Sequence, residues 1–321
     1  MSYLRQLTNR MEAAWPKASL RAYLIAIILL TIAPIAAILS LQVFNEVRSE
    51  QAQLEDELAR SAGAMSQAVE RELLSSLDGL SVLAESELFQ QGHVATLGRL
   101  LQGRPRRDWD SVFLLERDGS VVLDTAAPQV SAQSAGALRD LQRRVSSQRA
   151  PAVSGLSPGQ PGERYVAIAM PVDEDGAVRY VLGARMGETV WQRLASGAGK
   201  PAGGNAALYD GQDRLIGYSL ADVAPAGAAL PRDAAASMRN RPAGVHRSSD
   251  VDGSAVYAAW EAIPMSDWRV RVAVPAVPID AAHRKALLAA LTTSGGSLLL
   301  GLLLAALVAR RVARPLPRLA T

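Results

Sequence analysis

The pattern of charged and apolar positions divides the chain into two membrane-type stretches and a large segment between them. Two stretches without a charged residue, Ala22–Asn45 and Ala286–Ala309, are each 24 residues long. An apolar helix of about 20 residues spans the ~30 Å hydrocarbon core of a bilayer, so both are predicted to be transmembrane helices. A cleaved signal peptide is the alternative for the first stretch. Its apolar core would be only about 7–15 residues long, so the longer run here favours an uncleaved anchor.

The basic residues that flank the two stretches predict their orientation. Residues 1–21 carry a net charge of +3 and residues 310–321 a net charge of +4, whereas the whole chain carries +3, which leaves −4 for the middle. Because positive residues beside transmembrane segments stay cytoplasmic, we expect both termini inside and residues 46–285 outside, in the periplasm or the extracellular space. The basic balance therefore reflects a two-pass topology in a bacterial inner (plasma) membrane and gives no support to nucleic-acid binding.

An apolar stripe at helical spacing follows the first membrane stretch. It predicts a long helix over residues 46–103, and no proline occurs from Ser49 to Gly103. Two interpretations of the stripe stay open, because it can pack on the domain's own core or on the same helix of a second chain, and both can hold for different parts. The stripe consists of Leu54, Leu58, Ala62, Met65, Val69, Leu73, Leu77, Leu80 and Leu83.

After residue 104 the apolar pattern alternates as in strands and is interrupted by turn signals. Asp118-Gly119 and the segment Asp173-Glu-Asp-Gly176 each separate two apolar runs, which predicts two β-hairpins. The expected elements of this unit are strands at 110–117, 120–124, 164–172 and 177–186, with helices at 135–147 and around Trp191 and Leu194.

The same order of elements is predicted to repeat after a linker rich in Gly, Ala and Pro, Ser196–Gly204. The second set comprises strands at 206–209, 214–219, 255–263 and 268–274, with a helix at 233–239. The sequence therefore predicts an α+β fold with a long helix and two antiparallel-sheet modules, at 104–198 and 205–276.

At this point the chain resembles a known family over Asn45–Lys285, the double Cache (tandem PAS-like) extracytoplasmic sensor domain of bacterial transmembrane receptors. The resemblance rests on the order of elements and on three segments, Phe113-Leu-Leu-Glu-Arg-Asp-Gly-Ser-Val-Val-Leu123, Val166-Ala-Ile-Ala-Met-Pro171 and Trp268-Arg-Val-Arg-Val-Ala-Val-Pro275. It implies a small-molecule ligand in the membrane-distal module (104–198), a homodimer through the long helix and the transmembrane helices, and no enzymatic activity.

The last residues, 310–321, resemble the opening of a HAMP linker, since Ala309-Arg-Arg-Val is followed by Ala-Arg-Pro-Leu-Pro-Arg-Leu-Ala320. The family's usual outputs are a histidine kinase, a chemoreceptor signalling domain or a cyclic-di-GMP enzyme. The sequence carries no catalytic histidine motif, nucleotide-binding fingerprint or cyclase-like signature. We therefore expect the output domain to be missing through truncation, rather than supplied by a separate protein.

Candidate ligand-binding residues lie in the predicted distal module. Arg139 and Arg143 are four residues apart and would share one helix face. Because guanidinium groups bind carboxylates through two hydrogen bonds, a small organic anion is the expected ligand, and a solvated basic face is the alternative. The amino-acid-binding branch of the family carries a Tyr and then an Arg-x-Trp-Tyr run, which is absent here. Further candidates are Trp109, Tyr165 and Asp173.

Other chemistry has little support in the sequence. Gly155-Leu-Ser157-Pro-Gly159 matches the G-x-S-x-G pattern of hydrolases, but Gln-Pro-Gly-Glu follows it, which opens a helix poorly. A membrane-tethered hydrolase with Ser157 as nucleophile is therefore one alternative, and a ligandless envelope scaffold is another. The chain has no cysteine, and its three histidines lack a metal-ligand spacing. No metal or cofactor is expected.

Overall fold

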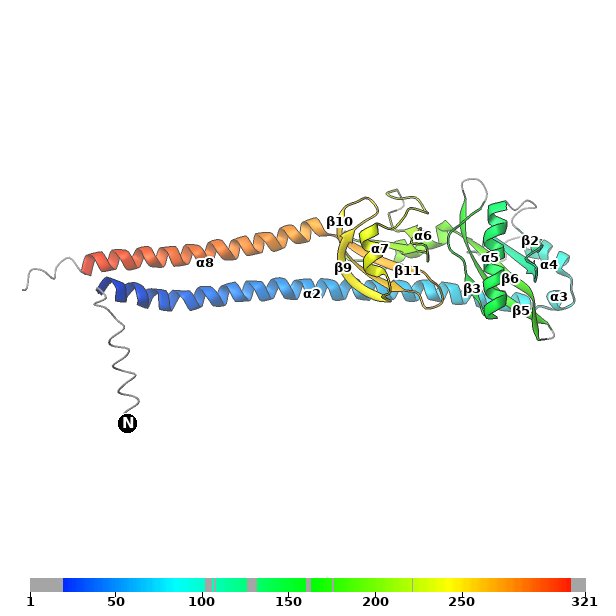
Figure 1. Ribbon diagram of the computed structural model, residues 1–321, viewed down its shortest axis with the longest axis horizontal. Helices are drawn as coiled ribbons and strands as arrows, with labels where there is room; N and C mark the ends of the chain where they lie inside the picture. The colour runs from blue at the N-terminus through cyan, green and yellow to red at the C-terminus, as the bar shows by residue number, and fades with distance from the viewer. Residues whose placement is uncertain are drawn as a thin grey trace, which may run out of the picture. The chain divides into compact units, whose positions relative to one another are not determined.

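The computed structural model describes residues 20–101, 106, 108–125, 132–159, 163–174, 176–220 and 222–312. They fall into two compact units, Leu54–Val277 and a helical unit that combines Met1–Gln53 with Pro278–Thr321 (Figure 1). Residues 1–19 of the predicted cytoplasmic N-terminus and 313–321 of the HAMP-like segment lie outside the described residues.

The helical unit contains the first part of α2 (Leu20–Ala84) and most of α8 (Ala276–Val312). Helix α2 continues through Pro34. Among the residues whose side chains are described, one helical segment, Ala276–Leu304, is long and apolar enough to cross a membrane. The span at 22–45 stays a prediction, because many of its side chains lie outside the described set.

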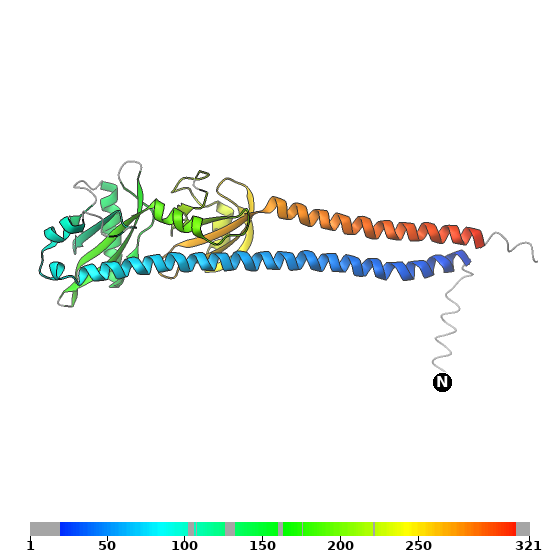
Figure 2. The same cartoon turned by 180° about the vertical axis from the view of Figure 1, so that it is seen from behind.

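The part of α2 that belongs to the larger unit runs past both of its sheets (Figure 2). The apolar stripe is buried from Leu58 to Leu80, with no member more than 9% exposed, which confirms its core interpretation over this range. Helix α2 ends at Ala84 rather than continuing to residue 103, and two short helices follow, α3 (Glu87–Gln90) and α4 (Val94–Leu101). Gly92 lies between them with a φ of 76°, in the left-handed region that glycine adopts without strain.

The first sheet matches the two predicted hairpins and adds two very short strands. Its order is β2-β1-β6-β5-β3, with β4 also paired to β5, and every pairing is antiparallel. Helix α5 (Ala132–Gln148) covers one face and buries Leu138, Leu141 and Val145 there. The strands are β1 (Ser111–Glu116), β2 (Val121–Asp124), β3 (Ala152–Val153), β4 (Ser157–Pro158), β5 (Arg164–Glu174) and β6 (Ala177–Gly187).

The second sheet repeats the strand order of the first and confirms the internal repeat. After α6 (Glu188–Gly197), the order is β8-β7-β11-β10-β9, and both first hairpins carry a register shift at the same place, after Leu114 and after Leu208. Helix α7 (Arg232–Met238) packs on one face. The strands are β7 (Asn205–Tyr209), β8 (Leu215–Tyr218), β9 (Ala243–Ser249), β10 (Ala255–Ala262) and β11 (Arg269–Pro275).

The two sheets are joined by a short segment of the first module. The indole nitrogen of Trp268 donates to the carbonyl of Ser154 at 3.2 Å, and the backbone N–H of Leu156 donates to the buried carboxylate of Asp210 at 3.0 Å. Trp191 packs edge-on against Trp268, with ring centroids 4.9 Å apart. We call this set of contacts the joint, and it fixes residues 154–156 to the second module.

Candidate functional site

A buried polar cluster lies on the face of the first sheet that α5 covers. Arg185 on β6 is paired with Ser111 on β1 and with Ala167 on β5, and Asp124 on β2 is paired with Phe113. Because side chains alternate between the two faces of a sheet, Ser111, Phe113, Asp124, Tyr165 and Arg185 all point to the same side. We call these five residues the Arg185 cluster.

Arg185 and Asp124 form a buried, bidentate ion pair at the centre of this cluster. The guanidinium donates to the two carboxylate oxygens at 2.8 and 2.7 Å, and one of its nitrogens donates to the Ser111 hydroxyl at 3.2 Å. The side chains are only 8% and 6% exposed. Although burial opposes the charged form, the hydrogen bonds and charge of Asp124 raise the pKa of Arg185 above its usual value. Arg185 is therefore a fixed positive group inside the module.

Two aromatic rings flank the guanidinium of Arg185. Its central carbon lies 5.5 Å from the ring centroid of Phe113 and 5.2 Å from that of Tyr165, within the range of cation–π attraction. The Tyr165 hydroxyl also lies near enough to raise the pKa of Arg185, without the geometry of a hydrogen bond. These rings hold the arginine in one orientation.

Two hydrogen-bonding groups of the cluster are left open. The Tyr165 hydroxyl and the Nε of Arg185 are buried and have no hydrogen-bond partner among the described residues. A buried polar group without a partner costs about 1–3 kcal/mol, so such groups are usually satisfied by a bound molecule or water. Both groups can donate, so together they suit an acceptor such as a carboxylate oxygen.

A second carboxylate lies beside this cluster, at the same end of β6. The backbone N–H of Asp110 donates to the carbonyl of Arg185 at 2.9 Å, and a Cβ added at Gly187 would lie 2.5 Å from the Asp110 carboxylate. Burial and the nearby charge of Glu163 raise the pKa of Asp110, against an opposing hydrogen bond from the Gly187 backbone. An acidic group therefore lies next to the cluster and can accept a hydrogen bond from a cationic ligand group.

Comparison with known proteins identifies the fold. No protein-family model and no curated protein sequence matches the chain. Among solved structures, the ligand-binding domain of the Pseudomonas fluorescens chemoreceptor CtaA in complex with L-isoleucine matches with a TM-score of 0.57 at 13% identity, over 74% of this chain and 99% of that one. The ligand-binding domain of the Pseudomonas aeruginosa amino acid chemoreceptor PctB in complex with L-Arg matches with a TM-score of 0.51 at 18% identity, over 75% and 93%.

The extracellular domain assigned to the histidine kinase rpHK1S-Z16 also matches, with a TM-score of 0.51 at 15% identity, over 71% of this chain and 98% of that one. The chain has the fold of these sensor domains. The resemblance seen in the sequence is thereby confirmed at the level of the fold, and it covers nearly the whole of each sensor domain compared.

Within this sensor fold the five predicted ligand residues are distributed over separate places. Tyr165 belongs to the Arg185 cluster, whereas Trp109 is buried beside α2, where its indole N–H donates to the Ser76 hydroxyl at 3.2 Å. Arg139 and Arg143 are exposed on α5, and Arg143 forms an ion pair with Asp140. Asp173 is exposed at the second hairpin and pairs with Arg149 at 3.2 Å. Their roles in binding stay predictions.

The sequence reasoning missed Arg185, Asp124 and Ser111. The available signal was a charge at an inward position of an apolar strand, since Arg185 interrupts the run Val181-Leu-Gly-Ala184 and Met186, and Asp124 ends Val121-Val-Leu123. The helical spacing instead points to Arg139 and Arg143, which are exposed on α5.

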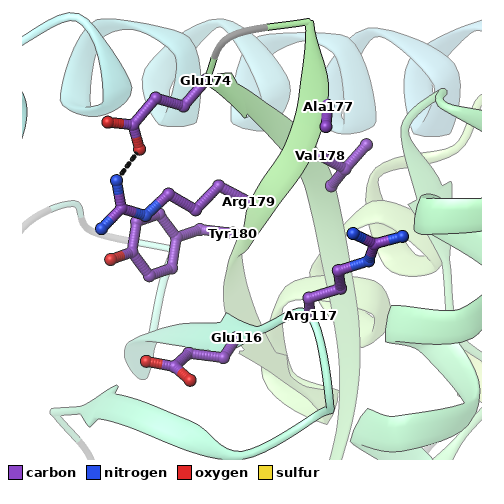
Figure 3. Close-up of a pocket in the computed structure, with 7 residues that line it drawn as sticks. All are labelled: Glu116, Arg117, Glu174, Ala177, Val178, Arg179 and Tyr180. Carbon is purple, nitrogen blue, oxygen red and sulfur yellow. Dashed lines mark hydrogen bonds and ion pairs between the residues drawn. The ribbon is translucent and has the colours of Figure 1, made fainter.

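The sensor fold also contains an open depression away from the cluster (Figure 3). It has a volume of about 450 Å³ and is lined by Glu116, Arg117, Glu174, Ala177, Val178, Arg179 and Tyr180. Arg179 and Glu174 pair with each other there and are both about half exposed. Solvent and salt screen such pairs, so this depression offers a ligand less electrostatic attraction than the buried cluster does.

The G-x-S-x-G match does not have the structural context of a nucleophile elbow. Ser157 is the first residue of the short strand β4, whereas the elbow needs a strand that turns into a helix at the serine. The hydroxyl of Ser157 is buried and donates to the carbonyl of Gly155 at 3.2 Å. This segment instead contributes to the joint between the two modules.

Proposed function

We propose that the chain is the small-molecule-sensing input region of a bacterial transmembrane receptor of the histidine kinase, chemoreceptor or cyclic-di-GMP enzyme type. Its sensor domain would lie outside the cytoplasm, at residues 46–285, between transmembrane helices at 22–45 and 286–309 with both termini inside. The sensor fold carries this proposal, and the Arg185 cluster supports a ligand site in the distal module. The proposed activity is binding and not catalysis.

The ligand class follows from the open groups of the Arg185 cluster. A small organic anion could accept hydrogen bonds from the Tyr165 hydroxyl and from Nε of Arg185. An amino acid is the second candidate, because the Asp110 carboxylate beside the cluster could accept from an ammonium group. The structures of CtaA and PctB, which contain L-isoleucine and L-Arg, support this second candidate.

The joint offers a route from this site toward α8. Ser157 on β4 pairs with Tyr165, and the neighbouring residues Ser154 and Leu156 bind the second module. Strand β11 follows directly after Trp268 and ends at Pro275, where α8 begins at Ala276. A ligand would shift this arrangement only through its different affinities for the two states of the module.

A dimer is proposed as the working state, as expected for a receptor that signals through paired helices. Two apolar side chains of α2, Leu74 and Val82, are 44% and 69% exposed and lie eight residues apart, on one side of the helix. Oxidation of the Val82→Cys variant in membranes should produce a disulfide-linked dimer that an Ala177→Cys variant does not form, and equal cross-linking of the two would contradict the arrangement.

A thermal-shift screen of the full chain in detergent micelles tests the proposed binding. The panel should contain small organic acids, amino acids and the matching acids without the amino group. A ligand at a hundred times its Kd adds about 2.7 kcal/mol of stability. Removing one hydrogen bond by Tyr165→Phe should weaken binding by about 1 kcal/mol, which is about a fivefold rise in Kd.

The matched control is Tyr180→Phe, which changes the open depression and should leave the affinity unchanged. Absence of stabilisation by every compound would contradict the sensing function. Stabilisation that survives Tyr165→Phe but is lost in Tyr180→Phe would move the site to the depression.

A further inference from the structure

The second, membrane-proximal module contains a buried polar set of the same kind on its α7-covered face. Arg271 on β11 and Asp250, directly after β9, form an ion pair at 2.9 Å, with side chains only 1% and 3% exposed. The pair has the same chemistry as Arg185 and Asp124, although Asp250 lies at the β9 edge of its sheet and Asp124 at the opposite, β2 edge of the first sheet. It belongs to a module for which neither the sequence nor the proposed function assigns a ligand.

The charges of this pair are held by further buried groups. The Asp250 carboxylate accepts hydrogen bonds from the Asn205 amide at 2.7 Å and from the Tyr218 hydroxyl at 2.9 Å. The Arg271 guanidinium also donates to the Ser248 hydroxyl and to the carbonyl of Ser249, both at 2.9 Å. The pair is therefore neutral as a whole and rigidly placed.

Arg271 itself and two side chains beside the pair nevertheless keep hydrogen-bonding atoms without a partner among the described residues. The Tyr209 hydroxyl, the Nε of Arg271 and both ring nitrogens of His246 are buried without a hydrogen-bond partner in the described part of the chain. Tyr209 is fully buried and Arg271 is 1% exposed. In the distal module the buried groups of the same chemical type without a partner among the described residues are the Tyr165 hydroxyl and the Nε of Arg185.

The strand register brings these open groups to one side of the second sheet. Arg271 pairs with Ala207 and Trp260, Ala258 pairs with His246, and Tyr209 follows Ala207 by two residues on β7. All of these positions therefore face α7. The ring of His246 stands edge-on to Trp260 with centroids 4.9 Å apart, which orients the imidazole.

Arg271 also influences both neighbours electrostatically. Burial lowers the pKa of His246, and the positive charge of Arg271 lowers it further, against the opposing charge of Asp233. Burial raises the pKa of Tyr209 to about 12, and the charge of Arg271, which lies near the hydroxyl without hydrogen-bond geometry, opposes the shift. At neutral pH His246 and Tyr209 are therefore both neutral, and each keeps a hydrogen to donate.

We propose that the membrane-proximal module contains a second ligand site, in which Nε of Arg271, the Tyr209 hydroxyl and a ring N–H of His246 bind a small carboxylate. These three donors lie in one buried polar set and match the oxygens of such an anion. Alanines at 207 and 258 and the ring of Trp260 form the sheet surface around these three side chains. The site is separate from the Arg185 cluster and does not depend on it.

Acetate is the probe that tests this site, with the full chain in detergent micelles and sodium chloride at equal ionic strength as the reference. We expect a concentration-dependent rise in Tm with acetate in the unmodified protein. Tyr209→Phe removes one hydroxyl and should raise the apparent Kd for acetate by about fivefold, if one hydrogen bond is worth about 1 kcal/mol. His246→Phe keeps an aromatic ring against Trp260 and should have a similar effect.

Tyr180→Phe is the matched control, since it removes a hydroxyl of the open depression, which belongs to neither buried polar set. It should leave the acetate response unchanged, whereas Tyr165→Phe reports any acetate that binds at the Arg185 cluster. An acetate response that is unaltered in both Tyr209→Phe and His246→Phe would overturn the proposal. No rise in Tm at about 100 mM acetate, a hundred times a millimolar Kd, would overturn it as well. Unchanged Tm values of the variants without acetate establish that they fold.

Discussion

At the residue scale, the unit Leu54–Val277 is distinguished by charges placed where apolar side chains would be expected. Each of the two modules buries an arginine, Arg185 or Arg271, in a two-residue ion pair with an aspartate. Removing two charges from water is expensive, and well-packed apolar residues would often be as stable or more so. Their presence on the helix-covered face of each sheet therefore supports the two proposed ligand sites.

The variant Arg185→Met tests how strongly the distal pair is coupled to its surroundings. It leaves the Asp124 carboxylate buried beside an apolar side chain, so we expect the free energy of unfolding to fall by about 3–5 kcal/mol in a denaturant titration. Arg143→Met is the control, because its ion pair with Asp140 is exposed, and it should cost less than about 1 kcal/mol. Equal effects of the two variants would contradict the buried ion pair.

At the element scale, local signals in the sequence predicted most of the fold. The hairpin turns at Asp118-Gly119 and at Asp173–Gly176 carry their own turn chemistry, so β1, β2, β5 and β6 could be located to within a few residues. Strand β9 was missed because its sequence, Ala-Gly-Val-His-Arg-Ser-Ser, has few of the apolar residues that mark a strand, and its pairing with β10 stabilises it instead.

The candidate site was harder to predict, because it is assembled from elements far apart in the chain. Arg185 and Asp124 are separated by 61 residues, and only the sheet register brings them together. Tyr165 was identified from its position on a hairpin. The helical spacing of Arg139 and Arg143 shows that they share a face but not whether that face is buried.

The joint between the two modules gives a prediction at this scale. A Cβ at Gly155 would lie 2.8 Å from the Asp210 carboxylate and 3.0 Å from the Arg214 guanidinium, so Gly155→Ala should strain the joint and cost about 1–3 kcal/mol of unfolding free energy. Gly136→Ala on α5 has no atom within 4 Å of the added Cβ and should instead stabilise by about 0.5–1 kcal/mol. Destabilisation by both variants to the same extent would exclude a special role of the joint.

At the scale of the whole molecule, the two modules share strand order, register shift and buried ion-pair chemistry, but they differ in their connection to the rest of the chain. The distal module is joined to the second module through residues 154–156, whereas the proximal module continues through β11 into α8. A ligand in the distal module would therefore act on α8 through the joint. A ligand in the proximal module would act on the sheet that continues directly into that helix.

The central claim is that ligand binding outside the membrane controls an output inside, and a chimaeric receptor tests it most directly. Residues 1–312 would be fused to the HAMP linker and kinase domain of a histidine kinase, and autophosphorylation would be measured in membranes against the concentration of a compound found in the screen. The account predicts a saturable change in kinase activity whose midpoint rises by about fivefold in Tyr165→Phe, as expected for the loss of about 1 kcal/mol of binding. Kinase activity that stays constant while the same compound raises the Tm of the chain would contradict it.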